Sequence, residues 1–333
     1  MSELPPNDGH YAPEVPPASP ADMQPTGAPP EARAGAGLAQ LPRRAARWAL
    51  DRITPWVPPL GAAYDAFLIR RWMRHELGYE PDLRNPRTYN EKLAWRILHD
   101  RNPLIALTSD KLAVRDYVAA KVGTDILVPL HGAYERAADI PWCSLPRRFV
   151  LKANHGSGMN LLVHDKNGMD PEPVRRQAAA WLRRNYYAET REWAYRKIKP
   201  RLLAEDMLLD EQGRIPPDLK FYVFHGRVAM LRIHLDRFGA HCVNFYDPDL
   251  RPLPFRQTFP TKPDYVPPAE LRALGRLAER LAEDFDFARI DLFHVRGQVR
   301  FGEITHYDGA ARVPFTPREY DRIVGNLWHL PQQ

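Results

Sequence analysis

The sequence predicts an α+β architecture made of two strand-rich halves, each covered by helices. Three observations support this prediction. Apolar runs of strand character occur in two separate stretches, Phe149–Val163 and Arg201–Leu235. A hairpin pattern, Ala288–Thr305, closes the second group of strands. Amphipathic helical patterns flank both groups, and the clearest of them is Pro267–Phe285.

Composition and charge are those of an ordinary globular enzyme. The chain has 333 residues, enough for one large domain or two to three smaller ones with a sizeable core. Its 47 Lys and Arg against 41 Asp and Glu give a small, distributed basic excess, which suits anionic substrates and does not indicate nucleic acid. The two cysteines, Cys143 and Cys242, lack metal-ligand spacing, so we expect a reduced, cytoplasmic setting.

By composition and pattern the chain divides into four predicted parts. Residues 1–40 are rich in Pro, Ala and Gly, lack an apolar period and are expected to be disordered. Residues 41–107 are expected to form an N-terminal helical region, 108–200 a first lobe and 201–333 a second lobe. No run reaches the roughly 20 apolar residues that a membrane span needs. The basic pattern at 41–53 suits either a surface helix or a peripheral membrane contact.

Capping signals and periodicity predict the individual elements. Thr88 and the run Thr108-Ser109-Asp110 are expected to cap helices, because their side-chain oxygens can accept from free N–H groups. Gly78 and Gly123 are expected to end helices. The predicted helices are Ala63–Leu77, Tyr89–His99, Lys111–Lys121, Pro171–Tyr187, Pro267–Phe285 and one from Pro317 to about Leu330. The predicted strands are Phe149–Lys152, Met159–Val163, Arg201–Met207, Lys220–His225 and Val228–Leu235, besides the hairpin.

A lysine followed by a small-residue loop suits phosphate binding. The first predicted strand ends at Lys152 and runs into Ala153–Gly158, which reads ANHGSG, after which a strand resumes. Loop amides can approach phosphate oxygens, and the lysine adds a positive charge. Gly-Ser-Gly turns also occur in plain hairpins, and this alternative stays open.

The C-terminal hairpin pattern brings two carboxylates together if its loop has three residues. With Val295–Gly297 as the loop, Arg289, Asp291, Glu303 and Thr305 share one face. Arg289 then lies opposite Glu303, and the two acids are diagonal neighbours. A divalent cation relieves the repulsion between such acids, and Mg²⁺ prefers carboxylate oxygens. A loop of even length would put the acids on opposite faces, and a solvated hairpin with cross-strand charge pairs is the alternative.

Several segments, in order along the chain, resemble the ATP-grasp superfamily. Ser109-Asp110-Lys111 with Arg115 resembles the opening of its nucleotide-binding part, and FVLKANHGSG resembles its strand lysine and phosphate-covering loop. LLAEDML is similar to its adenosine-binding linker. Arg289-x-Asp291 with Glu303-x-Thr305 resembles its paired metal ligands and the adjoining arginine.

Within that superfamily the chain resembles the TupA-like ATP-grasp family of surface-polysaccharide loci. The matching segments are NPRTYNEKLAWR, Glu192-Trp193, IKPRLLAED, PDLKFYVFHG and FGEIT, and together they cover roughly Pro81 to Leu330. The resemblance implies an ATP-grasp fold, two α+β lobes gripping ATP with Mg²⁺. It implies an ATP-dependent ligase in which an amine attacks an acyl phosphate to give an amide. It further implies that an amino acid or peptide joins a uronic-acid polymer or its precursor. Soluble nucleotide chemistry favours the cytoplasm, and a peripheral contact at the inner membrane face, where lipid-linked glycans are built, stays open.

The resemblance also implies a role for each matching residue. Lys152 and Arg289 would be catalytic, with Arg289 stabilising the acyl phosphate and the oxyanion formed on amine attack. Asp291 and Glu303 would bind Mg²⁺ together with Thr305, which stands where many ATP-grasp enzymes have Asn and leaves the second metal open. The residues expected to bind ATP are Lys111, Lys152, His155, Gly156, Ser157, Gly158, Glu205, Asp206, Met207 and Lys220.

Two other functions remain alternatives at this point. A phosphotransferase of the same fold would use the same phosphate and metal groups without making an amide. A non-catalytic binding module of an assembly complex would have no affinity for nucleotide. His306 and Asp308 follow the hairpin and are further candidates for the site.

Overall fold

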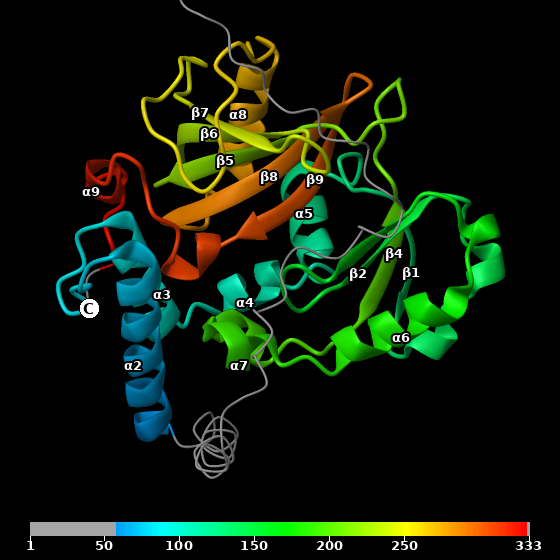
Figure 1. Cartoon of the computed structure of the whole chain (residues 1–333), viewed down its shortest axis with the longest axis horizontal. Helices are drawn as coiled ribbons and strands as arrows, with labels where there is room; N and C mark the ends of the chain where they lie inside the picture. The colour runs from blue at the N-terminus through cyan, green and yellow to red at the C-terminus, as the bar shows by residue number, and fades with distance from the viewer. Residues whose placement is uncertain (1–57, 332–333) are drawn as a thin grey trace, which may run out of the picture. The chain divides into compact units, whose positions relative to one another are not determined.

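The structure is a computed structural model that describes residues 58–331, drawn in colour in Figure 1. The predicted disordered segment 1–40 and the basic pattern at 41–53 lie outside the described residues. Two antiparallel sheets, of four and five strands, and the helices packed on them make up the described part. The α+β prediction is confirmed.

The elements of the described part are as follows. The helices are α2 (Pro58–Leu77), α3 (Tyr89–His99), α4 (Pro103–Ser109), α5 (Val114–Val122), α6 (Pro171–Leu182), α7 (Tyr186–Thr190), α8 (Leu271–Leu281) and α9 (Glu319–Gly325). The strands are β1 (Leu130–Tyr134), β2 (Phe149–Ala153), β3 (Asn160–Val163), β4 (Leu202–Asp206), β5 (Asp218–Phe224), β6 (Arg227–Leu235), β7 (Cys242–Tyr246), β8 (Phe287–Val295) and β9 (Gln298–Thr305).

The four-stranded sheet has the order β1-β4-β2-β3, and α6 packs against β2. Its interior strand β4 pairs with both β1 and β2. The predicted division at residue 201 assigns this strand to the second lobe, whereas its pairing is with the first sheet. The reason lies in Leu202, Leu203 and Ala204, which are buried on both faces of the strand, as suits an interior position.

The five-stranded sheet has the order β7-β6-β5-β8-β9. Helix α8 packs on one face of it, where Phe221 and Leu231 lie near Leu271. Successive side chains of a strand point to opposite faces, so Lys220 and Tyr222 of β5 point to the other face. Every residue of β5 is buried, including these polar ones. The face away from α8 is therefore a buried polar surface.

Local hydrogen bonds decide where the helices begin and end, and some of these ends differ from the predicted ones. The helix at 89–99 is confirmed, with a capping box in which Thr88 and Glu91 satisfy each other's backbone N–H groups. The helix predicted at 111–121 begins only at Val114, because the Asp110 carboxylate accepts from the N–H of Leu112 at 2.8 Å and holds a turn there. The preceding residues form α4, which the sequence analysis missed.

Other predicted helices are longer than the observed ones. The prediction at 171–187 is two helices, α6 and α7, because the Asn185 side chain accepts from Ala188 N at 3.0 Å and starts a new helix. Helix α8 keeps the predicted apolar face with Leu271, Leu274 and Leu281 buried, but it is shorter than 267–285. The last helix, α9, is shorter than 317–330 as well.

The C-terminal hairpin differs from its prediction in two ways that offset each other. Its turn has two residues, Arg296 and Gly297, both with positive φ (51° and 69°), because Val295 pairs with Gln298. A two-residue turn alone would put the two acids on opposite faces. A β-bulge intervenes: Leu292 pairs with Phe301 and Asp291 with Glu303.

The extra residue of this bulge is Gly302, and it restores the shared face. The two acids are directly opposite each other rather than diagonal, and Arg289 lies opposite Thr305 rather than Glu303. The predicted face is therefore right although the predicted loop is wrong.

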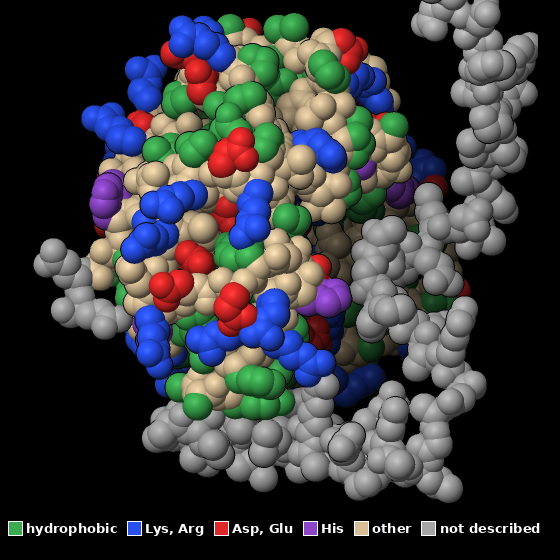
Figure 2. Space-filling view, turned by 60° about the vertical axis from the view of Figure 1, so that its left-hand side comes forward, with side chains coloured by type: hydrophobic (Ala, Val, Ile, Leu, Met, Phe, Trp, Pro, Cys, Tyr) green, Lys and Arg blue, Asp and Glu red, His purple; other side chains and the backbone are tan. Residues whose placement is uncertain are grey.

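Figure 2 shows one face of the molecule, with Lys and Arg side chains spread among Asp and Glu rather than gathered in one patch. Between residues 58 and 331, no helix combines the length and apolar character needed to cross a membrane.

Candidate active site

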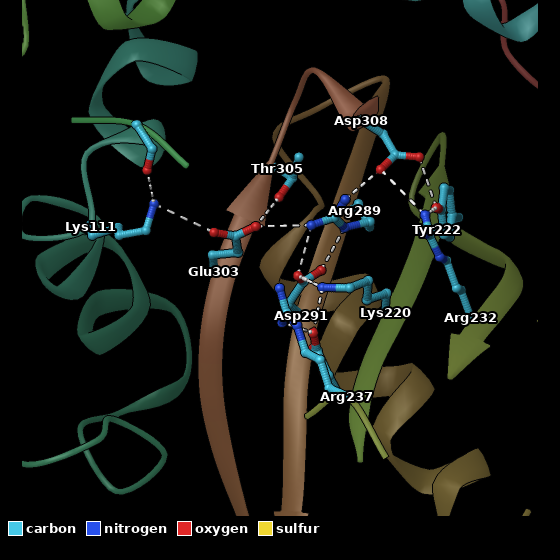
Figure 3. Close-up of polar contacts among 12 residues, drawn as sticks. Lys111, Lys220, Tyr222, Arg232, Arg237, Arg289, Asp291, Glu303, Thr305 and Asp308 are labelled. Carbon is cyan, nitrogen blue, oxygen red and sulfur yellow. Dashed lines mark hydrogen bonds and ion pairs between the residues drawn. The ribbon is translucent and has the colours of Figure 1, made fainter. Parts of the chain in front are cut away.

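A buried arginine on β8 is the centre of the polar face. The Arg289 guanidinium donates from Nε to Asp291 Oδ1 at 2.7 Å and from Nη2 to Glu303 Oε1 at 2.9 Å (Figure 3). It also donates to the carboxylate of Asp308, which follows β9. A buried charge is tolerated only when paired, and the planar fork of arginine can serve several carboxylates at once. The three acids fix the orientation of the guanidinium.

Lys220 of β5 completes the charge balance on the other side of Asp291. Its Nζ bonds Asp291 and lies 2.8 Å from Asp218 Oδ2. Register explains the meeting, because Lys220 lies directly opposite Asp291 on the neighbouring strand. Both oxygens of Asp291 are thus engaged by cations.

Glu303 differs from Asp291 in being partly open to solvent. Its side chain is 33% exposed, against 4% for Asp291. Thr305 Oγ1 donates to Glu303 Oε1 at 2.8 Å, while Glu303 Oε2 has Lys111 Nζ at 3.6 Å. Partial burial raises the pKa of Glu303, but Lys111, Arg289 and Lys220 outweigh it and hold the pKa below its ordinary value. Glu303 is an ionised carboxylate with one oxygen available.

Lys111 connects the loop of the first sheet with the acid of the second. The Lys111 side chain donates from Nζ to Gly156 O at 2.7 Å, and the Lys111 backbone N–H donates to Asn154 O at 3.2 Å. The loop is closely packed at Gly156, where a Cβ would lie 2.6 Å from the Tyr186 ring. Gly158 has φ +71°, a conformation that favours glycine.

Lys152 has a separate acid partner. Its Nζ lies 2.5 Å from Glu205 Oε2, and Arg115 Nη1 donates to Glu205 Oε1 at 3.3 Å. Glu205 on β4 lies opposite Val150, which is two residues before Lys152 in β2 and points to the same face as Lys152. Of the two residues after Glu205, Asp206 bonds His131 Nε2 at 2.7 Å.

A network of tyrosines holds Asp308. Tyr222 OH donates to Asp308 Oδ2 at 2.8 Å and Tyr89 OH at 3.4 Å, while Arg232 Nη1 lies 3.9 Å from Oδ1. The second oxygen of this carboxylate is thereby occupied, leaving the first for Arg289. Helix α3, through Tyr89, thus contributes to the centre.

The structure brings the candidate residues into two groups. One comprises Lys111, Lys220, Arg289, Asp291, Glu303 and Thr305, linked by the contacts above. The other is the Lys152–Glu205 pair. His155 is buried in the loop, Ser157 is exposed, and Met207 is half-buried after β4.

Sequence reasoning missed Asp218, Tyr222 and Arg232, which share the polar face. The signal was available for the first two: the run Asp218-Leu-Lys220-Phe-Tyr222 alternates polar and apolar, which places its polar residues on one face. Arg232 required the β5–β6 register, in which it lies opposite Lys220.

The donor set can be compared with what Mg²⁺ prefers. Asp291, Glu303 and Thr305 offer carboxylate and hydroxyl oxygens on adjacent strand positions. In the part of the chain that the structure describes, no group of three His, Cys, Asp or Glu side chains is placed to hold a metal. Mg²⁺ commonly takes only one or two carboxylates and fills its octahedron with phosphate oxygens and waters. Glu303, with one open oxygen, fits such an ion, whereas both oxygens of Asp291 are held by Lys220 and Arg289.

Comparison with known proteins gives a family and a set of similar structures. The model of the family described as TupA-like ATPgrasp matches residues 91–329. No match was found among curated proteins.

The similar solved structures include D-alanine–D-alanine ligase from Bacillus anthracis complexed with ATP (13% identity, 61% of this chain, 56% of that chain, TM-score 0.36). They also include ATP-grasp ligase PsnB complexed with minimal precursor (11% identity, 67% of this chain, 61% of that chain, TM-score 0.36). A third is the RimK domain protein ATP-grasp from Sphaerobacter thermophilus DSM 20745 (12% identity, 73% of this chain, 72% of that chain, TM-score 0.40). The chain thus spans about six-tenths of the length of the first two.

Proposed function

This chain belongs to the TupA-like ATP-grasp family and has the ATP-grasp fold, and from that premise we propose that it is an ATP-dependent carboxylate–amine ligase. ATP phosphorylates the carboxylate, and the amine then displaces phosphate from the acyl phosphate. The C–N bond forms as the bond between the acyl carbon and the phosphate oxygen breaks, inorganic phosphate leaves, and the amine proton goes to a base or to water. The products are an amide, ADP and phosphate.

One observation carries the proposal: Lys111 Nζ lies 2.7 Å from Gly156 O and 3.6 Å from Glu303 Oε2. The glycine loop after β2 and the acid on β9 are thus within reach of one ammonium group. A triphosphate bound between them would meet loop amides on one side and carboxylate-bound magnesium on the other.

In this proposal, each candidate residue contacts a different part of the nucleotide or of the reacting groups. Lys111 and Lys152 neutralise the phosphates, and Gly156, Ser157 and Gly158 cover them with backbone amides. Glu205, Asp206 and Met207 contact the adenosine. Lys220 keeps a positive charge beside the reacting phosphate, and Arg289 stabilises the oxyanion that forms when the amine attacks. His155 supports the loop from inside.

Asp291, Glu303 and Thr305 would hold the magnesium. Bound there, the ion would neutralise phosphate charge as a Lewis acid. Glu303 would supply its open oxygen, while Asp291 would supply one only after Arg289, which donates to both of its oxygens, releases it. The two sheets correspond in this proposal to two nucleotide-gripping lobes, with the boundary after β4 rather than at residue 201.

The carboxylate and amine in this proposal are a uronic acid of a surface polysaccharide or its precursor and an amino acid or peptide. The reaction takes place in the cytoplasm, with peripheral contact at the inner membrane face. These substrates rest on family membership alone.

The decisive experiment supplies Mg-ATP with panels of uronic acids and amino acids and measures ADP and amide by mass spectrometry. The ligase proposal expects ADP only when acid and amine are both present. ADP with a phosphorylated acceptor and no amine requirement would identify a phosphotransferase. If Mg-ATP produced no thermal shift, the chain would be a non-catalytic module.

A further inference from the structure

The polar face of the five-stranded sheet continues beyond the residues assigned above. Strand register places Glu303, Asp291, Lys220 and Arg232 directly opposite one another on β9, β8, β5 and β6. Residues that pair in this way point to the same face. The row of charges therefore extends across β5 onto β6, away from the Lys111 end of the site.

Four side chains in this extension are buried with a polar atom that lacks a hydrogen-bond partner within residues 58–331. The residues are 4–8% exposed, and the atoms are Asp218 Oδ1, Arg232 Nε, His234 Nε2 and Gln257 Oε1. A buried polar atom without a partner costs about 1–3 kcal/mol. Four of them on one face need a common explanation.

Pairing and ring contacts place these side chains together. Asp218 lies opposite His234, two positions along from the pair of Lys220 and Arg232 and therefore on the same face. The segment carrying Gln257 lies along β7, because Leu253 N donates to Phe245 O and Val243 N donates to Pro260 O, both at 2.8 Å. The Phe259 ring of this segment is 3.9 Å from the His241 ring, and His241 in turn bonds His234 Nδ1 at 2.9 Å.

The other end of this segment is fixed in the same way. The Phe255 ring lies 4.6 Å from that of Phe245, the residue opposite Arg232 on β7. Phe255 and Phe259 thus both contact side chains of this face, and Gln257, midway between them in sequence, is buried.

We propose that Asp218, Arg232, His234 and Gln257 bind the carboxylate substrate, and that this substrate carries hydroxyl groups. The proposal rests on the proposed ligase function. At this site Arg232 Nε can donate, Asp218 Oδ1 and Gln257 Oε1 can accept, and His234 Nε2 donates or accepts according to its tautomer. A hydroxyl both donates and accepts, so a hydroxylated acid can satisfy all four, whereas an alkyl acid leaves them unpaired. Its carboxylate lies toward Lys220 and Arg289, where phosphoryl transfer occurs.

The test measures binding directly. D-glucuronate and hexanoate are titrated by calorimetry into the full chain loaded with Mg²⁺ and a non-hydrolysable ATP analogue. We expect glucuronate to bind at least ten-fold more tightly than hexanoate. Gln257→Met, which keeps the side-chain length and removes the carbonyl, should weaken glucuronate binding about ten-fold. Equal binding of the two acids, or binding of neither, would overturn the proposal.

A pair of substitutions at His234 separates binding from structure. His234→Asn keeps a polar group near the place of Nδ1 and removes Nε2, whereas His234→Gln keeps one near the place of Nε2. We expect the Asn variant to lose glucuronate binding and the Gln variant to retain most of it. Arg227→Gln, at the exposed end of the same strand, is the matched control and should bind as the wild type does.

Stability gives a readout that needs no ligand. If Gln257 Oε1 is kept for substrate, Gln257→Met should leave Tm unchanged or raise it, because an unpaired buried carbonyl is removed. A lower Tm with unchanged glucuronate affinity would show that ordered water satisfies the site and would refute the proposal. Glucuronate binding without amine-dependent ADP release would instead refute the ligase function and leave the site standing.

Discussion

At the scale of single residues, Arg289 explains how three acids lie side by side in a buried site. Its guanidinium contacts Asp291, Glu303 and Asp308, and Lys220 adds a second charge at Asp291. Removing one partner of a buried ion pair costs several kcal/mol, because the other charge stays behind unpaired. Substitutions in the buried part of this cluster therefore confound stability with activity. Glu303, the partly exposed member, is the better probe.

We expect Glu303→Gln to abolish amide-forming activity while the fold persists. The amide cannot carry the negative charge that Lys111 and magnesium require, so kcat should fall by about 10² or more. Coupled ADP release and thermal unfolding should be measured together. A variant with wild-type turnover would remove Glu303 from the site, and Glu283→Gln, in an exposed ion pair with Lys121, is the control that should keep full activity.

Glu192 is a buried carboxylate whose protonation should be visible in stability. Burial raises its pKa to about 8, against the opposing effect of Arg312 and Lys111, while Glu303 adds to the rise. The unfolded chain ionises near the ordinary value of 4.5. Between these two values the folded state holds a proton that the unfolded state has lost, so the free energy of unfolding should fall as pH rises from 4.5 to 8.

The variant Glu192→Gln tests this, because it cannot titrate. Urea unfolding at pH 5, 6, 7 and 8 should show the variant gaining stability relative to the wild type as pH rises. Parallel curves for the two proteins would mean that Glu192 is ionised in the folded state.

At the scale of elements, the β8–β9 hairpin shows how one bulge sets the chemistry of a face. The two-residue turn at Arg296-Gly297 alone would place Asp291 opposite Gly302 and turn Glu303 to the other face. The bulge at Gly302 shifts the register by one residue, so Glu303 joins Asp291. Space is restricted there: a Cβ on Gly302 would lie 3.0 Å from Asp291 O and 3.1 Å from the Phe293 ring.

We expect Gly302→Ala to lower the free energy of unfolding by about 1–3 kcal/mol, as overpacking does. Activity should fall as well, because the backbone that must move belongs to Asp291. Urea unfolding and ADP release measure the two effects.

The matched control is Gly297→Ala, in the turn of the same hairpin. A Cβ on Gly297 would meet nothing within 4 Å, but the residue has a positive φ that alanine adopts at a cost. The free energy of unfolding should therefore fall by about 1 kcal/mol, with activity retained. Equal activity losses in both variants would mean that the bulge has no special role.

At the scale of the whole described part, the two sheets have separate apolar cores and share a polar contact. One buried apolar cluster belongs to the five-stranded sheet and the N-terminal helices, and the other to the four-stranded sheet and α6. Lys111, between Gly156 and Glu303, connects the phosphate loop with the acid pair. A ligand that bridges these groups should stabilise the protein as a whole.

We expect Mg-ATP to raise Tm. At 100 times its Kd, a ligand adds about 2.7 kcal/mol to stability, which corresponds to about 4 °C for a chain of this size. Lys111→Met should lose most of this shift in differential scanning fluorimetry. Lys121→Met, which removes ion pairs with Glu283 and Asp284 outside the site, should keep the full shift. An identical shift in both variants would exclude Lys111 from the nucleotide site.

The sequence by itself determined the local features of this protein. Alternation and capping predicted the α3 helix, the β2–β3 hairpin with its loop, and most other strands, because these patterns depend on near neighbours. The hairpin acids were found by the same alternation, although the loop length behind that prediction was wrong. The family, too, could be read from short ordered motifs.

Only the tertiary structure decided which distant side chains meet. Strand β4 joins the first sheet, Arg232 lies beside Lys220, and Tyr89 reaches Asp308 across 219 positions of sequence. Register shifts such as the bulge at Gly302 are likewise set by packing of both faces rather than by the hairpin alone. Long-range pairing is a sum of many weak contacts, and no single residue pattern encodes it.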